Sequence, residues 1–185
     1  MRMTWIVALA LAIAPVPSRA NESADSSWQA TLERWLPRAG HRNWIAVVDA
    51  AYPDQTSSGV EMVVTDEEHL KVVRHVLDRL QQAEHVRPVL RLDAELPHVA
   101  LADAPEIDQY RADLAQLLAG REAARVPHEE IIDRLDAAGQ KFRVLVLKTT
   151  MTLPYTSVFI ELDCGYWSAE AEQRLRRAME ASSRQ

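Results

Sequence analysis

Two side chains that can carry protons flank an early apolar segment: residues 43–48 lie between His41 and Asp49 in "GHRNWIAVVDAAYP". An imidazole has an ordinary pKa of about 6.5, so it can donate or accept a proton near neutrality, and a carboxylate can bind hydroxyl groups or orient an acid. On an extended strand this spacing is roughly 25 Å, so a loop that folds back or a neighbouring subunit must bring the two to one pocket. Otherwise His41 is an ordinary loop histidine, and Asp49 starts a turn.

Two further segments offer polar groups. In "VPHEE", His128 lies in the first turn of a short helix, where Glu129 and Glu130 also suit a solvated helix start. In "LPYTS", residues 153–157, the Tyr155 hydroxyl and the small hydroxyls beside it would line a site for a polyhydroxylated ligand. The alternative for this segment is a plain connecting loop with its tyrosine on the surface.

Asp93, Glu95 and His98 form a weaker group at the end of an expected strand, where a divalent metal could bind. A cluster of this kind is more often a solvated strand end. His69 and His75 are six positions apart on one expected helix, which is the wrong spacing for shared metal ligation. The aromatic rings of "GYW", residues 165–167, could stack on a sugar or pack around the last helix.

Several familiar signatures are missing from the sequence. It has no glycine-rich phosphate loop, no G-x-S-x-G elbow and no paired-cysteine zinc pattern. Phosphoryl transfer and dinucleotide chemistry are therefore disfavoured. A secreted hydrolase that uses Ser157 or Ser58 with a histidine and an aspartate is a remote alternative.

The elements that must position these residues alternate between apolar strands and amphipathic helices. This alternation predicts an α/β fold, a single-domain layered sandwich with a largely parallel sheet. Thr65 and Glu68 are expected to form a capping box at the start of the second helix. The expected strands are residues 43–50, 60–65, 86–96, 142–149 and 157–163, and the expected helices are residues 28–40, 66–82, 105–120, 127–139 and 168–182.

The first 20 residues have the layout of a secretory signal, with cleavage after Ala20, and residues 21–27 form a polar lead that we expect to be mobile before a domain at 28–185. We therefore expect an exported protein, periplasmic or secreted, with no membrane span. Without residues 1–20, which include Arg2 and Arg19, 19 basic side chains remain against 27 acidic ones, a net charge of −8. This charge disfavours nucleic acid and anionic lipid as partners. The single cysteine, Cys164, cannot form an internal disulfide.

Three segments together resemble the ribose pyranase and fucose mutarotase family (RbsD/FucU). They are "GH" followed by "DA" with a proline soon after, "PHEE" at the start of a helix, and "LPYTSVFIEL" before and within the last strand. The resemblance covers about residues 36–167. It implies an α/β sandwich that assembles into rings, with sites shared between neighbouring subunits.

The resemblance also implies roles for individual residues. His41 would be the proton donor, Asp49 and His128 would act in catalysis and in sugar binding, and the loop that holds Tyr155, Thr156 and Ser157 would contact the ligand. Ser157 stands where the family usually has asparagine, so the preferred sugar can differ.

The function that the resemblance implies is a sugar mutarotase or pyranase, an isomerase that interconverts anomers or ring forms by acid–base ring opening. Such a reaction needs no cofactor and no metal. The expected partners are a monosaccharide and further copies of the same chain in a ring. The alternative is a periplasmic protein that binds a monosaccharide without catalysis.

Overall fold

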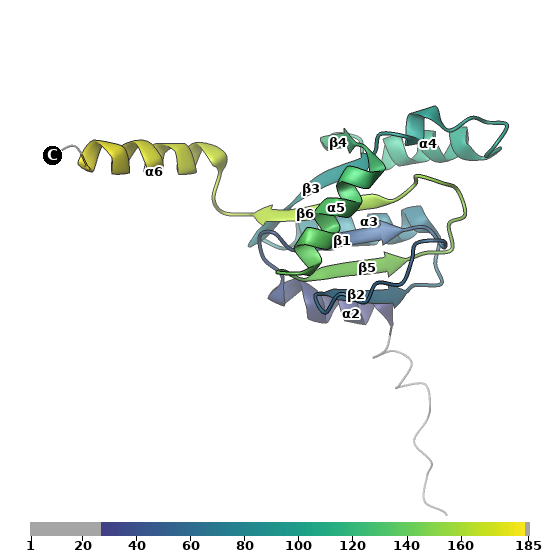
Figure 1. The fold of residues 1–185 in the computed structure, drawn as a ribbon, viewed down its shortest axis with the longest axis horizontal. Helices are drawn as coiled ribbons and strands as arrows, with labels where there is room; N and C mark the ends of the chain where they lie inside the picture. Colours follow the sequence, from purple (N-terminus) through teal and green to yellow (C-terminus); the bar gives the residue numbers. More distant parts are fainter. Residues whose placement is uncertain (1–26, 184–185) are drawn as a thin grey trace, which may run out of the picture.

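The computed structural model describes residues 27–183, which form one mixed α/β domain followed by a projecting helix (Figure 1). The expected signal sequence, its cleavage point at Ala20 and residues 21–26 of the polar lead lie outside the described residues. Within residues 27–183, every helix is too short or too polar to span a bilayer.

The centre of the domain is a six-stranded sheet with the order β2-β5-β1-β6-β3-β4. Strand β6 runs antiparallel to its neighbours β1 and β3, whereas the other three pairs are parallel. The predicted α/β fold with a largely parallel sheet is thus confirmed. The strands are β1 (Trp44–Val48), β2 (Val60–Val64), β3 (Val86–Asp93), β4 (Ala123–Val126), β5 (Val144–Lys148) and β6 (Val158–Cys164).

Helices cover both faces of the sheet, and β1 shows why its sequence is a continuous apolar run. Ile45 and Val47 face a core that includes residues of α2, α3 and α4, whereas Trp44, Ala46 and Val48 face a core that includes α5. Because both faces are buried, no position of β1 is polar. The helices are α2 (Trp28–Trp35), α3 (His69–Gln81), α4 (Ile107–Leu117) and α5 (His128–Gly139), with short 3-10 helices at Leu36–Arg38 and Leu96–His98.

The start of α3 differs from the predicted capping box. Glu68 itself is the N-cap, and its carboxylate accepts hydrogen bonds from the amides of Leu70 and Lys71. Thr65 instead continues the sheet, since both its amide and its hydroxyl donate to the carbonyl oxygen of Lys148. The prediction was wrong because this pairing with β5 delays the helix by three residues.

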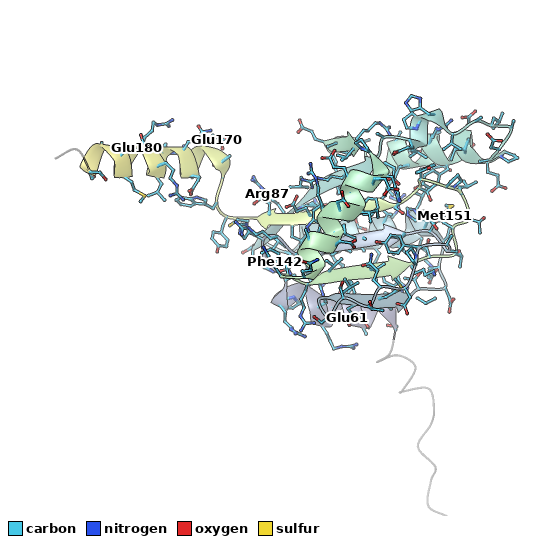
Figure 2. The ribbon with its side chains drawn as sticks, in the orientation of Figure 1. Glu61, Arg87, Phe142, Met151, Glu170 and Glu180 are labelled. Atoms are coloured by element: carbon cyan, nitrogen blue, oxygen red, sulfur yellow. The ribbon has the colours of Figure 1, made fainter. Side chains whose placement is uncertain are left out.

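The last helix, α6 (Ala169–Ser182), stands away from the body of the domain (Figure 1). None of its residues is buried, and Leu175 and Met179 are exposed. The side chains of Glu170 and Glu180 on this helix are exposed (Figure 2).

Candidate functional site

The predicted site residues Asp49, His128 and Tyr155 come together at one edge of the sheet. Asp49 follows the end of β1 and His128 follows β4. Because β1 and β3 both run antiparallel to β6 and β4 runs parallel to β3, β1 and β4 point the same way, and both residues lie at the carboxyl ends of their strands. Open α/β sheets bind ligands at this edge. A cavity of about 500 Å³ is lined here by Asp49, Ala50, Ala51, His128, Thr152, Leu153, Pro154 and Tyr155. A second cavity of about 300 Å³ shares Asp49, Ala51 and His128 with the first.

A buried carboxylate holds the imidazole of His128. Its Nδ1 lies 3.0 Å from Oδ1 of Asp93, which is fully buried at the end of β3. Burial raises the pKa of Asp93, and its hydrogen bond and electrostatic interaction with His128 oppose this rise. With Nδ1 held by Asp93, Nε2 is the ring nitrogen that remains for a ligand. Carboxylate–imidazole pairs of this kind fix the tautomer and the orientation of the ring.

Two more contacts set the position of His128. Both carboxylate oxygens of Glu95 accept from its backbone amide, at 3.0 and 3.1 Å, and so anchor the first residue of α5. The ring of Tyr155 meets the imidazole edge-on, with the ring centroids 5.6 Å apart and an interplanar angle of 82°. His128 is therefore fixed at its backbone, at Nδ1 and at its ring edge.

These contacts bear on the possible metal site at Asp93, Glu95 and His98. Both acids contact His128, whereas His98 is exposed and belongs to a 3-10 helix. Among residues 27–183, no group of three or more histidine, cysteine, aspartate or glutamate side chains is arranged to hold a metal ion. The acids at the end of β3 position the histidine instead.

Asp49 presents a carboxylate to both cavities from a turn. Its Oδ1 accepts a hydrogen bond of 2.8 Å from the amide of Ala51, as aspartate commonly does at the start of a turn. Tyr52, which lines the smaller cavity, has a pKa raised to about 12, chiefly by burial. It is therefore a neutral hydroxyl near pH 7.

The loop before β6 places Tyr155 in the larger cavity but turns its neighbours inward. Tyr155 has a φ of 57°, a conformation that few non-glycine residues adopt, and the residue is 40% exposed. Thr156 and Ser157 are buried, and neither lines the two cavities. The Thr156 hydroxyl donates to the carbonyl oxygen of Leu153, which closes the turn. Of the three predicted contacts in this loop, Tyr155 alone reaches the cavity.

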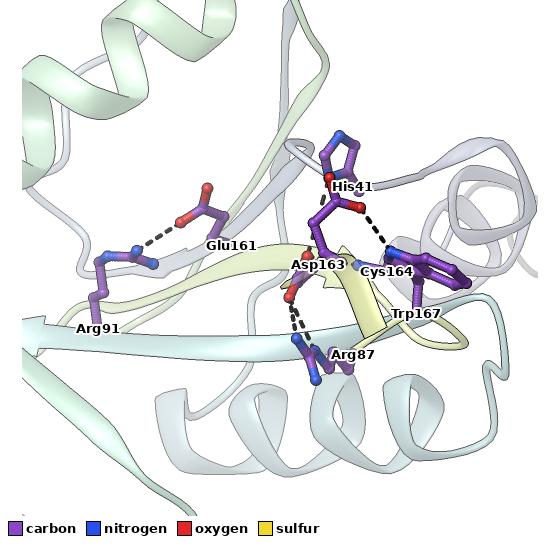
Figure 3. A network of polar contacts seen from close by, with 8 residues as sticks. His41, Arg87, Arg91, Glu161, Asp163, Cys164 and Trp167 are labelled. Carbon is purple, nitrogen blue, oxygen red and sulfur yellow. Dashed lines mark hydrogen bonds and ion pairs between the residues drawn. The ribbon is translucent and has the colours of Figure 1, made fainter. Parts of the chain in front are cut away.

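His41 lies at the opposite end of β1 from Asp49. It belongs to the turn before the strand and lines a different cavity of about 790 Å³, together with Arg87, Asp163 and Trp167 among others. Its Nδ1 is 4.0 Å from the Asp163 carboxylate, which also forms an ion pair with Arg87 (Figure 3). The hydrogen bond from Arg87 is the main reason why the pKa of Asp163 is lowered. Within one chain, His41 and Asp49 do not share a pocket.

Sequence reasoning considered Asp93 as a metal ligand and missed its contact with His128. The missing information is β4, which the sequence analysis did not expect. The parallel pairing of β3 with β4 places Asp93 opposite Val126, two residues before His128. A short strand with the sequence "AARV", buried on neither face, gives little apolar signal.

Comparisons with known proteins support the fold. No protein-family model and no curated protein matches the sequence. Bacillus subtilis RbsD complexed with D-ribose has a similar structure, with a TM-score of 0.50 and 18% identity, over 72% of this chain and 92% of that chain. The fucose mutarotase of Streptococcus pneumoniae in complex with L-fucose gives a TM-score of 0.48 and 18% identity, over 72% and 91% of the two chains. FucU from Bifidobacterium longum gives 0.47 and 10%, over 72% and 94%. The chain is thus an α/β domain with the fold of RbsD.

Proposed function

We propose that the protein binds a monosaccharide with a free anomeric hydroxyl in the cavity between Asp49, His128 and Tyr155 and interconverts its anomers or ring forms. The observation that carries this proposal is the contact between buried Asp93 and the partly exposed His128 at the wall of this cavity. The cavity volume lies within the range of about 300–1,000 Å³ that is usual for small-molecule sites. RbsD, which has the same fold, was solved with D-ribose bound.

The reaction requires one base and one acid. The base removes the proton of the anomeric hydroxyl, the C1–O5 bond of the ring breaks, and the acid protonates the ring oxygen. The open aldehyde then closes on either face, or through another hydroxyl, by the reverse proton transfers. Each positioned proton carrier contributes about 10²- to 10⁴-fold. No redox or group-transfer step is involved.

His128 is suited to be the base. As a carboxylate, Asp93 can only accept from Nδ1, so the proton of a neutral imidazole resides there and the lone pair lies on Nε2. When Nε2 takes the sugar proton, the positive charge forms 3.0 Å from the Asp93 carboxylate. The second oxygen of Asp49 would accept from sugar hydroxyls, and the Tyr155 ring would pack on the C–H face of the sugar.

The acid must come from elsewhere, and we assign it to His41 of a second copy. His41 is exposed at the far end of β1, so it cannot reach the cavity of its own chain. A ring or other closed assembly that places this end of one copy against the carboxyl edge of the next would complete the site. Export to the periplasm or the medium, signalled by residues 1–20, also belongs to this proposal.

Two other functions compete with this one. A protein that binds a monosaccharide without catalysis would keep the cavity but would not need the His128 proton relay. A serine hydrolase has less support: Ser157 is buried in the core, and Ser58 is an exposed turn residue that precedes β2 at the opposite edge of the sheet from His128.

The test is anomer exchange measured by saturation-transfer NMR with ribose, fucose, galactose and glucose. We expect the protein to accelerate the exchange of at least one sugar, and His128→Ala to abolish the acceleration. Glu130→Ala, which changes an exposed acid on the same helix, is the control and should leave the rate unchanged. Thermal stabilisation by a sugar without faster exchange would favour the binding protein. Neither effect with any sugar would refute the proposal.

A further inference from the structure

A buried histidine and a buried tyrosine, which the proposed chemistry does not use, contact the two segments that lead to the cavity. His69, the first residue of α3, has no exposed surface, and Tyr110 of α4 is 5% exposed. Their rings meet edge-on, with centroids 5.8 Å apart. A polar group buried this deeply lowers stability unless it is hydrogen-bonded. The hydrogen-bond partners of His69 and Tyr110 therefore show which parts of the backbone these side chains fix in place.

The partners are two backbone carbonyls, one at the end of β1 and one just before β6. They flank the point where these two strands stop pairing, which we call the fork. Nε2 of His69 lies 3.2 Å from the carbonyl oxygen of Val47, and the Tyr110 hydroxyl donates to the carbonyl oxygen of Thr156 at 2.7 Å. The antiparallel pairing of β1 with β6 ends where Val47 faces Val158. Beyond this point the segment that follows β1 leads to Asp49, and the segment that precedes β6 contains Tyr155.

The protons in this network are accounted for. A carbonyl only accepts, so Nε2 of His69 carries the hydrogen that reaches Val47, and the tyrosine hydrogen goes to Thr156. His69 Nδ1 then carries no hydrogen and lies 3.3 Å from the Tyr110 oxygen, whose one hydrogen goes to Thr156, so the two residues meet through their edge-on ring packing and each holds its own carbonyl. Burial lowers the pKa of His69 to about 4, so the ring is neutral near pH 7 and the network keeps this arrangement.

We propose that His69 and Tyr110 are positioning residues that hold the fork between β1 and β6 open and so set the spacing between Asp49 and Tyr155. Asp49 is two residues beyond Val47, and Tyr155 immediately precedes Thr156. The strained backbone of Tyr155, with its φ of 57°, is held on one side by the Thr156–Tyr110 hydrogen bond. The effect on sugar binding rests on the proposed function, whereas the effect on the loop does not.

The test variant is Tyr110→Phe, which removes only the hydroxyl, and the control is Leu114→Val, which trims a buried side chain one turn along the same helix. Hydrogen–deuterium exchange should become at least fivefold faster at the amides of residues 155–157 in Tyr110→Phe and should not change there in Leu114→Val. For the sugar that the wild type converts, we expect KM to rise about five- to tenfold while kcat stays within twofold, because the Asp93–His128 pair is not touched. His69→Gln, whose amide can still donate to Val47, should have a smaller effect than His69→Phe.

The outcomes separate this inference from the proposed function. If exchange at the amides of residues 155–157 is the same in Tyr110→Phe as in the wild type, or rises equally in Leu114→Val, the positioning role is refuted. If exchange rises but no sugar binds even to the wild type, the loop contact stands and the sugar site does not. If kcat falls with an unchanged KM, His69 and Tyr110 do not act on the binding residues.

Discussion

Replacing His69 by glutamine should remove the loss of stability that this residue causes when the protein is acidified. The folded pKa of His69 is about 4, against 6.5 for a free histidine, because burial disfavours the charged ring. Between these values the unfolded chain binds a proton at this residue and the folded chain does not. The stability that the neutral ring contributes is therefore complete above about pH 7 and is lost as the pH falls from 6.5 towards 4.

The magnitude follows from the two pKa values. Each pKa unit is worth about 1.4 kcal/mol, so the wild type should lose about 3 kcal/mol of unfolding free energy from this residue between pH 7.5 and pH 4. Glutamine does not titrate, so His69→Gln should be less stable than the wild type at pH 7.5 but should lack this loss. The raised pKa of Asp93 acts in the opposite direction, since it favours the folded state on acidification, and it is present in both proteins.

The assay is urea unfolding followed by tryptophan fluorescence at pH 7.5, 6.5, 5.5 and 4. The quantity of interest is the difference in unfolding free energy between wild type and His69→Gln, which should shrink by about 3 kcal/mol over this range. His98→Gln, which replaces an exposed histidine, is the control for the loss of one imidazole. If the difference stays constant to within 0.5 kcal/mol (roughly the error of such measurements), His69 is not held neutral by burial.

Three further outcomes are expected. Asp93→Asn should lower kcat for anomer exchange by about 10²-fold or more with little change in the melting temperature. The reason is that the asparagine amide can donate to Nδ1 of His128 and so favours the tautomer with its proton on Nε2. An unchanged kcat in the NMR assay would contradict this role. Arg87→Ala should cost less than about 1 kcal/mol in urea unfolding, since its ion pair with Asp163 is partly exposed, and the cost should shrink at 1 M salt. Ile160→Val should cost about 0.5–1.5 kcal/mol in the same assay, because the removed methyl group lies in the fully buried core; no loss would mean that β6 is less tightly packed than described.

Part of this site could be predicted from the sequence because it follows from local patterns. The apolar run at residues 44–48 predicts a buried strand, and Asp49 at its end is placed at a ligand-binding edge by the rule for open α/β sheets. His128 is recognisable at a helix start after a proline. The convergence of Asp49, His128 and Tyr155 then follows from the fold.

The remainder depends on pairings between distant segments. The role of Asp93 depends on the register of β3 against β4, and β4 has almost no apolar pattern of its own. In the sequence, nothing distinguishes His69 from other polar residues near the start of a helix. Its contact with Tyr110 arises only because α4 packs over it in the fold. The inward turn of Thr156 and Ser157 likewise comes from the buried contacts of the loop with the core.

The most direct test of the central claim, a sugar site completed by His41 of a second copy, is to mix two defective variants. His41→Ala and His128→Ala should each fail to accelerate anomer exchange on their own. In assemblies refolded from a 1:1 mixture, about a quarter of the sites would combine an intact His41 with an intact His128, so about a quarter of the wild-type rate should return. If the wild type accelerates exchange but the mixture stays as inactive as either variant, the site is not shared between copies and His41 does not supply its acid.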